Sequence, residues 1–263
     1  MPLPKMPTNA PEAELKQGRR VRADQYLVDL GHARSRSRAQ AMVKAGIVFA
    51  DDKPVTKPSQ MIAADTVLEL RGEDHPWVSR GGLKLVHAIT HFNLNPEGIT
   101  AIDVGASTGG FTDVLLHHGA ARVYAVDVGQ DQLVDKLRDD QRVVVMEQTN
   151  ARHLTREQIP DPVDWVVCDA SFISLELVLP AAMALTGDNA LLVALIKPQF
   201  EVGRGQLGKK GVVRDTDKQQ QVCERIAAWL ADQPGWQVEG MTPSPITGPE
   251  GNREFLILGR KVP

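Results

Sequence analysis

The feature that most constrains the fold is an alternation of strand-type and helix-type segments from about residue 83 almost to the end of the chain. Short apolar runs predict strands at residues 99–104, 123–127, 142–146, 163–168 and 190–196. Segments with helical periodicity predict helices at residues 83–91, 112–118, 130–137, 174–185 and 218–231. This alternation favours an α/β fold with a mostly parallel, doubly wound sheet. Strands 237–241 and 254–258 lack a clear helix between them, which predicts an antiparallel finish and seven strands in all.

The N-terminal part of the chain follows a different pattern. Residues 1–18 are polar and rich in proline, which predicts a disordered tail. Residues 19–70 predict a small α+β domain with a first helix around Tyr26, a second at 36–45, and strands at 47–50, near Val55 and at 67–70. Residues 71–82 hold proline, glycines and mixed charges, and predict a linker to a large domain over 83–263.

Composition excludes several classes of protein. No apolar run approaches the roughly 20 residues of a membrane-spanning helix, and the N-terminus lacks the apolar core of a secretion signal. The two cysteines, Cys168 and Cys223, make no disulfide framework and no zinc-type spacing. We therefore expect a cytoplasmic protein without a metal site.

The net charge of −3 hides an uneven distribution. Between Lys16 and Lys57 ten basic and four acidic residues give +6, which leaves −9 for the rest of the chain. A basic appendage on an acidic body indicates nucleic-acid binding, although the same arginines could be ordinary solvated helix residues. The candidate phosphate-binding residues are Arg20, Arg22, Arg34, Arg36, Arg38 and Lys44.

The basic segment also carries a recognisable motif. ADQYLVDLGHARSRSRAQAMVKAGIVFADDKPV resembles the small S4-type RNA-binding domain shared by a ribosomal small-subunit protein, tyrosyl-tRNA synthetases and many pseudouridine synthases. The resemblance covers about 50 residues and implies a structured RNA as partner.

A glycine-rich loop follows the first strand of the large domain. In IDVGASTGGF, glycines allow a tight turn and close approach of a ligand to the start of the next helix. The spacing matches neither a dinucleotide fingerprint nor a phosphate-binding loop with its lysine. Asp127, at the end of the next strand, could accept two ribose hydroxyls, and Asn150 could contact an adenine or be a plain turn residue. A nucleoside-containing ligand fits this pattern, with a dinucleotide-binding domain as the alternative. The candidate cofactor-binding residues are Asp103, Gly105, Ser107, Gly109, Gly110, Phe111, Asp127 and Asn150.

Four further ionisable residues are placed where strand ends and neighbouring loops converge. Asp169 and Lys197 end the fourth and fifth strands, Lys84 begins the helix before the first strand, and Glu254 starts the last strand. Ligands of open α/β sheets bind at the carboxyl ends of the strands. The four residues are therefore a candidate catalytic set, although ion pairs at a sheet edge would explain them equally well.

These motifs together resemble one family. SRGGLKL, DVGASTGGFTDVLL, VCDASFIS, IKPQFE and GNREFL, with the basic N-terminal domain, are similar to the TlyA family of ribosomal RNA methyltransferases, historically also called haemolysins. Lys84, Asp169, Lys197 and Glu254 match the Lys-Asp-Lys-Glu tetrad of 2′-O-ribose methyltransferases of the FtsJ type. The resemblance implies a Rossmann-like class I methyltransferase domain, S-adenosylmethionine as donor and a cytidine 2′-hydroxyl of ribosomal RNA as acceptor. It implies no metal, and we expect a monomer.

Other functions remain open from sequence alone. The acceptor could be another RNA, a small molecule or DNA, although DASF lacks the Asn/Asp-Pro-Pro-aromatic pattern typical of methylation at base amino groups. The haemolysin name suggests a membrane-lytic protein, which no long basic amphipathic helix supports.

Overall fold

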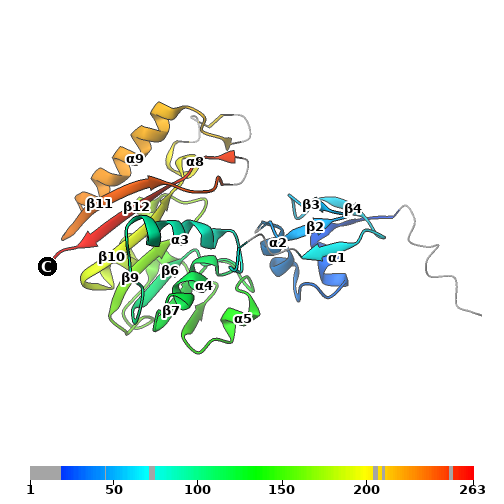
Figure 1. Ribbon diagram of the computed structural model, residues 1–263, viewed down its shortest axis with the longest axis horizontal. Helices are drawn as coiled ribbons and strands as arrows, with labels where there is room; N and C mark the ends of the chain where they lie inside the picture. Colours follow the sequence, from blue (N-terminus) through cyan, green and yellow to red (C-terminus); the bar gives the residue numbers. More distant parts are fainter. Residues whose placement is uncertain (1–18, 45, 71–74, 204–206, 209–210, 249–250) are drawn as a thin grey trace, which may run out of the picture. The chain divides into compact units, whose positions relative to one another are not determined.

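The computed structural model describes residues 19–44, 46–70, 75–203, 207–208, 211–248 and 251–263 (Figure 1). The chain divides into two compact units, residues 1–71 and 72–263. The predicted tail over 1–18 and the first part of the predicted linker, 71–74, lie outside the described residues.

The first unit is a small α+β domain, as its sequence predicts. Two helices precede most of the strands: α1 (Ala23–Asp29) and α2 (Arg36–Lys44). A three-stranded antiparallel sheet in the order β3-β2-β5 comprises β3 (Lys53–Pro54), β2 (Val48–Ala50) and β5 (Leu68–Leu70). The hydrophobic core of this first unit includes Leu27, Met42, Val48 and Ile62. A second ribbon, absent from the sequence prediction, pairs β1 (Arg20–Arg22) with β4 (Met61–Ala63).

The second unit contains a seven-stranded sheet in the order β11-β12-β10-β9-β6-β7-β8. Its parallel strands are β6 (Thr100–Val104), β7 (Arg122–Val126), β8 (Val143–Met146), β9 (Val163–Cys168) and β10 (Thr186–Ile196). The last two strands, β11 (Trp236–Pro243) and β12 (Phe255–Lys261), are antiparallel to each other, and β12 is antiparallel to β10. The predicted antiparallel finish is confirmed.

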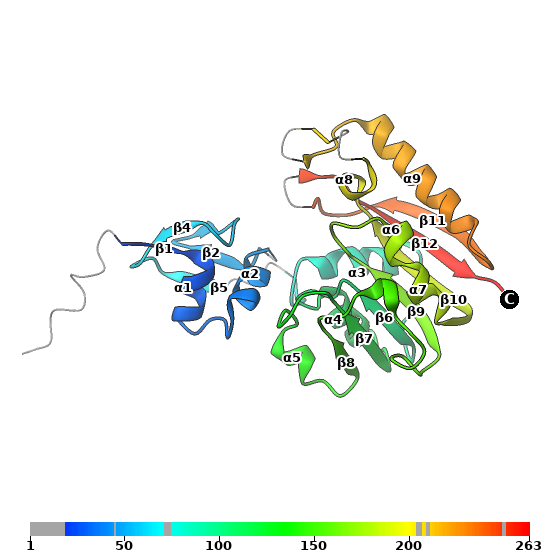
Figure 2. The same cartoon turned by 180° about the vertical axis from the view of Figure 1, so that it is seen from behind.

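Helices cover both faces of this sheet (Figure 1, Figure 2). On one face, α3 (Gly81–His91), α4 (Gly110–His117) and α5 (Asp135–Arg138) bury Leu85, Leu115 and Leu137. On the other, α6 (Leu175–Val178), α7 (Pro180–Ala184) and α9 (Thr216–Ala231) bury Leu175, Met183 and Ile226. Successive strand residues alternate between the two cores, because side chains of a strand point to opposite faces.

Two predicted helices differ in the structure, and each difference has a physical reason. The helix predicted over 174–185 is split into α6 and α7. Pro180 has no N–H to continue α6, and it instead occupies the first turn of α7. The helix predicted over 130–137 is reduced to α5, because the carboxylate of Glu147 accepts the backbone N–H groups of Asp131, Gln132 and Leu133 at 2.7–3.0 Å. These bonds hold the start of the segment as a loop.

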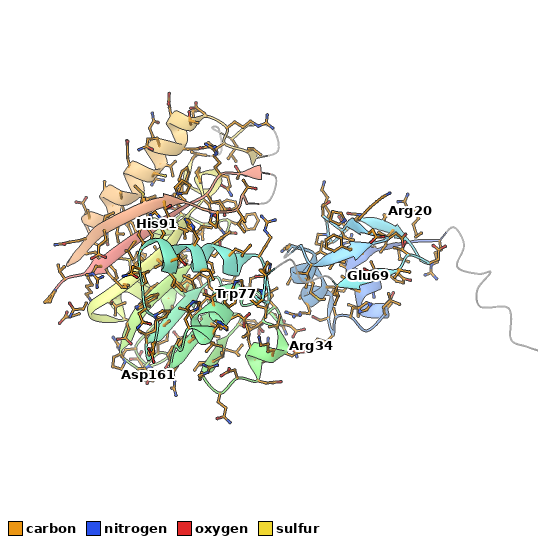
Figure 3. All side chains as sticks on the ribbon, in the orientation of Figure 1. Arg20, Arg34, Glu69, Trp77, His91 and Asp161 are labelled. Carbon is orange, nitrogen blue, oxygen red and sulfur yellow. The ribbon has the colours of Figure 1, made fainter. Side chains whose placement is uncertain are left out.

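The described end of the predicted linker packs against the second unit. Trp77, labelled in Figure 3, contacts His117 of α4 edge to face with ring centroids 5.1 Å apart, and Val78 N donates to Asp113 Oδ2 at 2.9 Å. Gly82 leaves room for Trp77, since a Cβ at Gly82 would lie 2.7 Å from the indole. Residues 77–82 therefore anchor the start of α3.

Candidate functional site

Strand direction brings the four predicted catalytic residues to one edge of the sheet. Asp169 and Lys197 each follow the last residue of a parallel strand, β9 and β10. Glu254 precedes β12, which runs the opposite way, and the register pairs Phe255 with Ile196. The amino end of β12 therefore lies beside the carboxyl end of β10, and α3 adds Lys84.

Lys84 bridges two carboxylates. Its Nζ lies 2.8 Å from Glu254 Oε2 and 3.2 Å from Asp169 Oδ2. Burial works to lower the pKa of Lys84, but the two carboxylates outweigh it and the pKa is raised. Lys84 is therefore a fixed positive charge at the centre of the site.

Lys197 shares Asp169 with Lys84. Its Nζ lies 2.7 Å from Asp169 Oδ1 and donates to the Asp169 carbonyl oxygen at 2.9 Å, and Ser171 Oγ is also 2.9 Å away. Burial works to raise the pKa of Asp169, but the two ammonium groups hold it below its usual value. The carboxylate carries a charge and the carbonyl belongs to the backbone. The Ser171 hydroxyl is therefore the partner of Lys197 that another hydroxyl can most easily replace. The cluster is thus built to hold an amine against a hydroxyl oxygen.

The glycine-rich loop lies between β6 and α4. Gly105 and Gly109 have φ angles of 82° and 98°, which favour glycine. A Cβ at Gly105 would lie 2.8 Å from Ala170 Cα, so this turn approaches the segment directly after Asp169. The loop and the charged cluster are therefore neighbours.

Three predicted ligand residues in this loop, Gly109, Gly110 and Phe111, are buried instead. Phe111 belongs to the core beneath the loop, and Gly110 is buried where a Cβ would meet Ser79 Oγ at 2.4 Å. Ser107, by contrast, is exposed, with a φ of 49°. The exposed part of the loop is the turn around Ser107.

Asp103 lies beneath the loop rather than on its surface. Its carboxylate is fully buried, and its Oδ2 accepts Thr112 N at 3.0 Å and Thr112 Oγ1 at 2.7 Å. Among the described residues, Oδ1 has no hydrogen-bond partner. Burial raises the pKa of Asp103 to about 7, against the hydrogen bonds from Thr112. In this structure Asp103 ties the strand to the start of α4, so its effect on a ligand is indirect.

Asp127 directly follows β7 and faces the loop. Its Oδ2 accepts Ser107 N at 2.8 Å, and its Oδ1 accepts Gly129 N at 2.7 Å. Each carboxylate oxygen can accept a second hydrogen bond, so the half-buried group keeps capacity for a diol. Val128, which the sequence reasoning missed, follows it with 74% exposure and offers an apolar surface.

Asn150 lies further along this edge, after β8. It is exposed, and its side-chain oxygen accepts Arg152 N at 3.1 Å as the cap of a short 3-10 helix (Ala151–His153). The structure thus gives Asn150 a local capping role, and its contact with a ligand stays a prediction.

Beside Glu254, the structure shows an open pocket. It is lined by residues 243–247 and 253–255, with the exposed cation Arg253 among hydroxyl and apolar groups. Arg80, just before α3, donates to the carbonyl of Thr247 and ties this loop to the helix that carries Lys84.

An exposed aromatic residue follows Ser171 and was also missed by sequence reasoning. Phe172 is 87% exposed, has a φ of 68° and contacts the ring of Phe200 at 4.9 Å. The signal was present in the DASF motif, but sequence alone does not tell an exposed phenylalanine from a core one.

In the first unit, the predicted RNA-binding residues are organised around a buried acid. Asp24, whose side chain is fully buried, accepts both Arg22 Nε and NH2 at 2.9 and 2.8 Å, and Arg36 NH2 at 3.2 Å. The hydrogen bond from Arg22 outweighs burial and holds the pKa of Asp24 well below its usual value. The negative charge of Asp24 thus fixes two arginines rather than opposing RNA at the surface.

The other predicted RNA-binding residues are spread over the unit. Arg20 and Arg34 lie on different sides of it (Figure 3). Arg20 NH2 donates to the carbonyl of Met61, Arg34 and Lys44 are exposed, and Arg38 is half-buried on α2. They do not all gather at one point.

The second unit is a Rossmann-like methyltransferase domain that uses S-adenosylmethionine. It is defined by the strand order of its sheet, the glycine-rich loop after β6 and the acid Asp127 after β7. Residues 77–261 match the family model described as FtsJ-like methyltransferase, and residues 21–68 match the S4 domain. The chain belongs to the FtsJ-like methyltransferase family, in its TlyA branch.

Relatives of known name support this assignment. The chain is 47% identical over 91% of its length, and 89% of the relative, to 16S/23S rRNA (cytidine-2′-O)-methyltransferase TlyA of Mycobacterium tuberculosis. It is 40% identical over 90% of its length, and 98% of the relative, to Hemolysin A of Brachyspira hyodysenteriae. A solved structure described as a hemolysin from Streptococcus thermophilus is 44% identical, with a TM-score of 0.73 over 92% of this chain and 89% of that one. The predicted fold, family and enzyme class are confirmed.

The residues present fit S-adenosylmethionine. The loop turn at Gly105, the carboxylate of Asp127 and the exposed Val128 provide a tight backbone approach, a diol acceptor and an apolar surface. Within the described ranges, no group of three or more His, Cys, Asp or Glu side chains is placed to hold a metal ion. In the same part of the chain, no helix is long and apolar enough to span a membrane.

Proposed function

We propose that this protein transfers a methyl group from S-adenosylmethionine to the ribose 2′-hydroxyl of a cytidine in ribosomal RNA. The observation that carries the proposal is the buried Lys84–Asp169–Lys197–Glu254 cluster beside the glycine loop. The activity for which the Mycobacterium tuberculosis relative is named supports the choice of acceptor. The substrate is large-subunit RNA, with small-subunit RNA as a second substrate, and the protein works as a cytoplasmic monomer.

The two units divide the work. Residues 19–70 dock on the RNA through Arg20, Arg22, Arg34, Arg36, Arg38 and Lys44, and residues 83–263 carry the chemistry. Contacts of these cations with phosphates set position rather than sequence, so the first unit reads the shape of a folded RNA. Positive charge gathered on the small unit attracts RNA to a chain whose net charge is negative.

The donor supplies a sulfonium-bound methyl group that is already activated for attack by an oxygen nucleophile. Gly105, Ser107, Gly109 and the carboxylate of Asp127 would hold the donor, and Val128 would add an apolar surface beside them. Asp103 and Thr112 keep this loop in place from below. Much of the rate comes from alignment, because the reacting atoms must approach in line.

Lys197 is the residue that contacts the 2′-oxygen, in the position that Ser171 Oγ occupies in the structure. As an ammonium ion, Nζ donates to that oxygen and the hydroxyl proton passes to water. As a neutral amine, Nζ accepts the proton itself. Asp169 orients Nζ, Lys84 keeps Asp169 ionised, and Glu254 balances the charge of Lys84.

Two surface features near Lys197 offer contacts to the acceptor nucleotide. The exposed ring of Phe172 offers a stacking surface for its base, since an aromatic side chain can stack on a nucleobase that has left its helix. The pocket with Arg253 lies on the Glu254 side and offers a cation for a phosphate. These surfaces favour a nucleotide in RNA over a small-molecule acceptor.

The test is methyl transfer from labelled S-adenosylmethionine to separated ribosomal subunits. We expect the wild type to label ribosomal RNA and the Lys197→Ala variant to label none. Label in neither subunit would reject the ribosomal substrate, and transfer to a different purified RNA would assign that one. Dye release from liposomes that is unaffected by Lys197→Ala would support the membrane-lytic alternative instead.

A further inference from the structure

Glu201, four residues after Lys197, is a buried carboxylate with no part in the proposed reaction. It ends α8 (Pro198–Glu201), and its side chain is 2% exposed. Its oxygens accept Ser174 Oγ and Leu175 N, both at 2.8 Å, and Arg225 NH2 of α9 at 3.0 Å. Hydrogen bonds to a charged group are the stronger ones, so Glu201 fixes the start of α6 firmly against α8.

The same two segments also meet closer to the reacting atoms. Ser171 Oγ lies 2.9 Å from Lys197 Nζ, and the ring of Phe172 lies 4.9 Å from that of Phe200. Segment 171–174 is thus joined to segment 197–201 at three places, and Glu201 makes the contact furthest from the lysine amine.

The turn between these contacts is in a conformation that needs support. Phe172 has a φ of 68°, a left-handed backbone conformation that is strained for a residue other than glycine. Its ring is 87% exposed, so burial of the ring does not supply that support. The contacts at Ser171 and Ser174, on either side of Phe172, do.

We propose that Glu201 is a positioning residue for methyl transfer, acting through the turn at residues 171–174. It holds Ser174 and Leu175, and the turn then holds the preceding segment, with Asp169 and Ser171, beside Lys197 Nζ, where the acceptor hydroxyl binds. Arg225 balances the buried charge of Glu201 from the exposed side, where it is also paired with Glu176. This inference rests on the proposed role of Lys197.

A merely structural role would have different consequences. If Glu201 only joined α8 to α9, its loss would destabilise the whole unit and weaken donor binding together with turnover. If it positions the turn, its loss lowers kcat while the affinity for the donor stays unchanged, and it loosens residues 171–175 alone.

The experiment compares Glu201→Ala, Glu201→Gln and Ser174→Ala with Glu224→Gln. The control residue is an exposed acid on α9 that is paired with Gln220. We expect Glu201→Ala to lower kcat by about 10- to 100-fold, as a misplacement of about 1 Å can do. Glu201→Gln keeps one acceptor oxygen and should lose less, Ser174→Ala should lose a few-fold, and Glu224→Gln should match the wild type.

Two further readouts decide the interpretation. Amide hydrogen exchange should speed up at residues 171–175 in Glu201→Ala and Ser174→Ala and stay unchanged elsewhere. KM for the donor should stay within about twofold of the wild type. A kcat within twofold of the wild type in Glu201→Ala, or faster exchange throughout the unit with weaker donor binding, would overturn the inference.

Failure of the proposed function looks different. A wild type that methylates no ribosomal RNA would reject that function, and the exchange measurement, which needs no acceptor, would still show whether Glu201 holds the turn. An active wild type with unchanged Glu201 variants would reject only the positioning role.

Discussion

Lys84 and Glu254 come from near the two ends of the second unit, yet Lys84 Nζ lies 2.8 Å from Glu254 Oε2. The lysine precedes the first strand of the large sheet and the glutamate precedes its last strand. Asp169 completes the bridge at 3.2 Å. Because Lys84 pairs with both carboxylates, the arrangement of the site and the closure of the sheet are linked.

Lys84→Met should therefore cost stability as well as activity. The substitution leaves Glu254, 1% exposed, without its counter-charge, and breaking a buried pair costs about 3–5 kcal/mol. Urea unfolding followed by tryptophan fluorescence measures the loss. Arg260→Met is the matched control: Arg260 and its partner Glu239 are 39% and 35% exposed, so its removal should cost less than about 1 kcal/mol. Equal losses in the two variants would contradict the bridging role.

Lys197→Ala should abolish transfer and spare donor binding. The amine lies against the Ser171 hydroxyl, and it is separate from the loop at Gly105 and Asp127 where we propose that the donor binds. Loss of a group that moves or holds a proton costs about 100- to 10,000-fold in rate. Calorimetric titration with S-adenosylmethionine should give an unchanged Kd. Activity within tenfold of the wild type would remove Lys197 from the reaction.

Asp103→Asn should change how stability depends on pH. The folded pKa of about 7 lies above the ordinary 3.8, so between these values the folded chain holds a proton that the unfolded chain has released. Stability of the wild type should then fall as pH rises from about 4 to about 7, by about 4 kcal/mol at about 1.4 kcal/mol per pH unit, and level off above.

The asparagine variant has no such proton to lose, and its amide oxygen can still accept from Thr112. Its stability relative to the wild type should therefore increase from pH 5 to pH 8, as measured by urea unfolding at each pH. A difference that is constant across this range would show that Asp103 ionises normally in the folded chain.

Asp24→Asn should destabilise the first unit at neutral pH by about 2–3 kcal/mol, because it weakens hydrogen bonds from two guanidinium groups to a buried charge. The folded pKa of Asp24 is lowered, so its contribution is present above the ordinary value of 3.8 and is lost as pH falls below it. Wild type and variant should converge in stability in acid. Asp29→Asn, an exposed acid on the same helix, is the control and should change little.

Sequence periodicity predicted the sheet of the second unit because its strands are buried on both faces and read as continuous apolar runs. Val163–Cys168 was predicted residue for residue. The periodicity did not predict β1, because Arg20–Arg22 is a short basic segment whose strand conformation depends on pairing with residues 61–63. The break at Pro180 was readable from sequence, whereas the loop held by Glu147 depends on a long-range contact.

The candidate catalytic cluster was predictable because strand direction and family motifs act together: Asp169 and Lys197 directly follow strands, Glu254 directly precedes one, and Lys84 lies on the helix before the first strand of the sheet. The neighbours of these residues were not predictable. That Asp103 lies beneath the loop, that Asp24 holds Arg22 and Arg36, and that Phe172 is exposed all follow from packing in three dimensions. Sequence predicted which ionisable residues gather at the sheet edge better than it predicted what they touch.

Lys44→Gln should weaken binding of ribosomal RNA without changing donor affinity. If the exposed ammonium group contacts a phosphate, its loss should reduce the slope of log K against log salt concentration by about 1. Filter binding at several salt concentrations measures the slope, with Lys136→Gln in the second unit as the control. An unchanged slope would place Lys44 away from the RNA.

The chemistry of the methylated product tests the central proposal most directly. Ribosomal RNA treated with the wild-type protein and S-adenosylmethionine should be digested to nucleosides and analysed by mass spectrometry, with RNA treated with Lys197→Ala in parallel. We predict 2′-O-methylcytidine that depends on the wild-type protein and is absent with the variant. A methyl group on a nucleobase, or 2′-O-methylcytidine formed equally by Lys197→Ala, would contradict it.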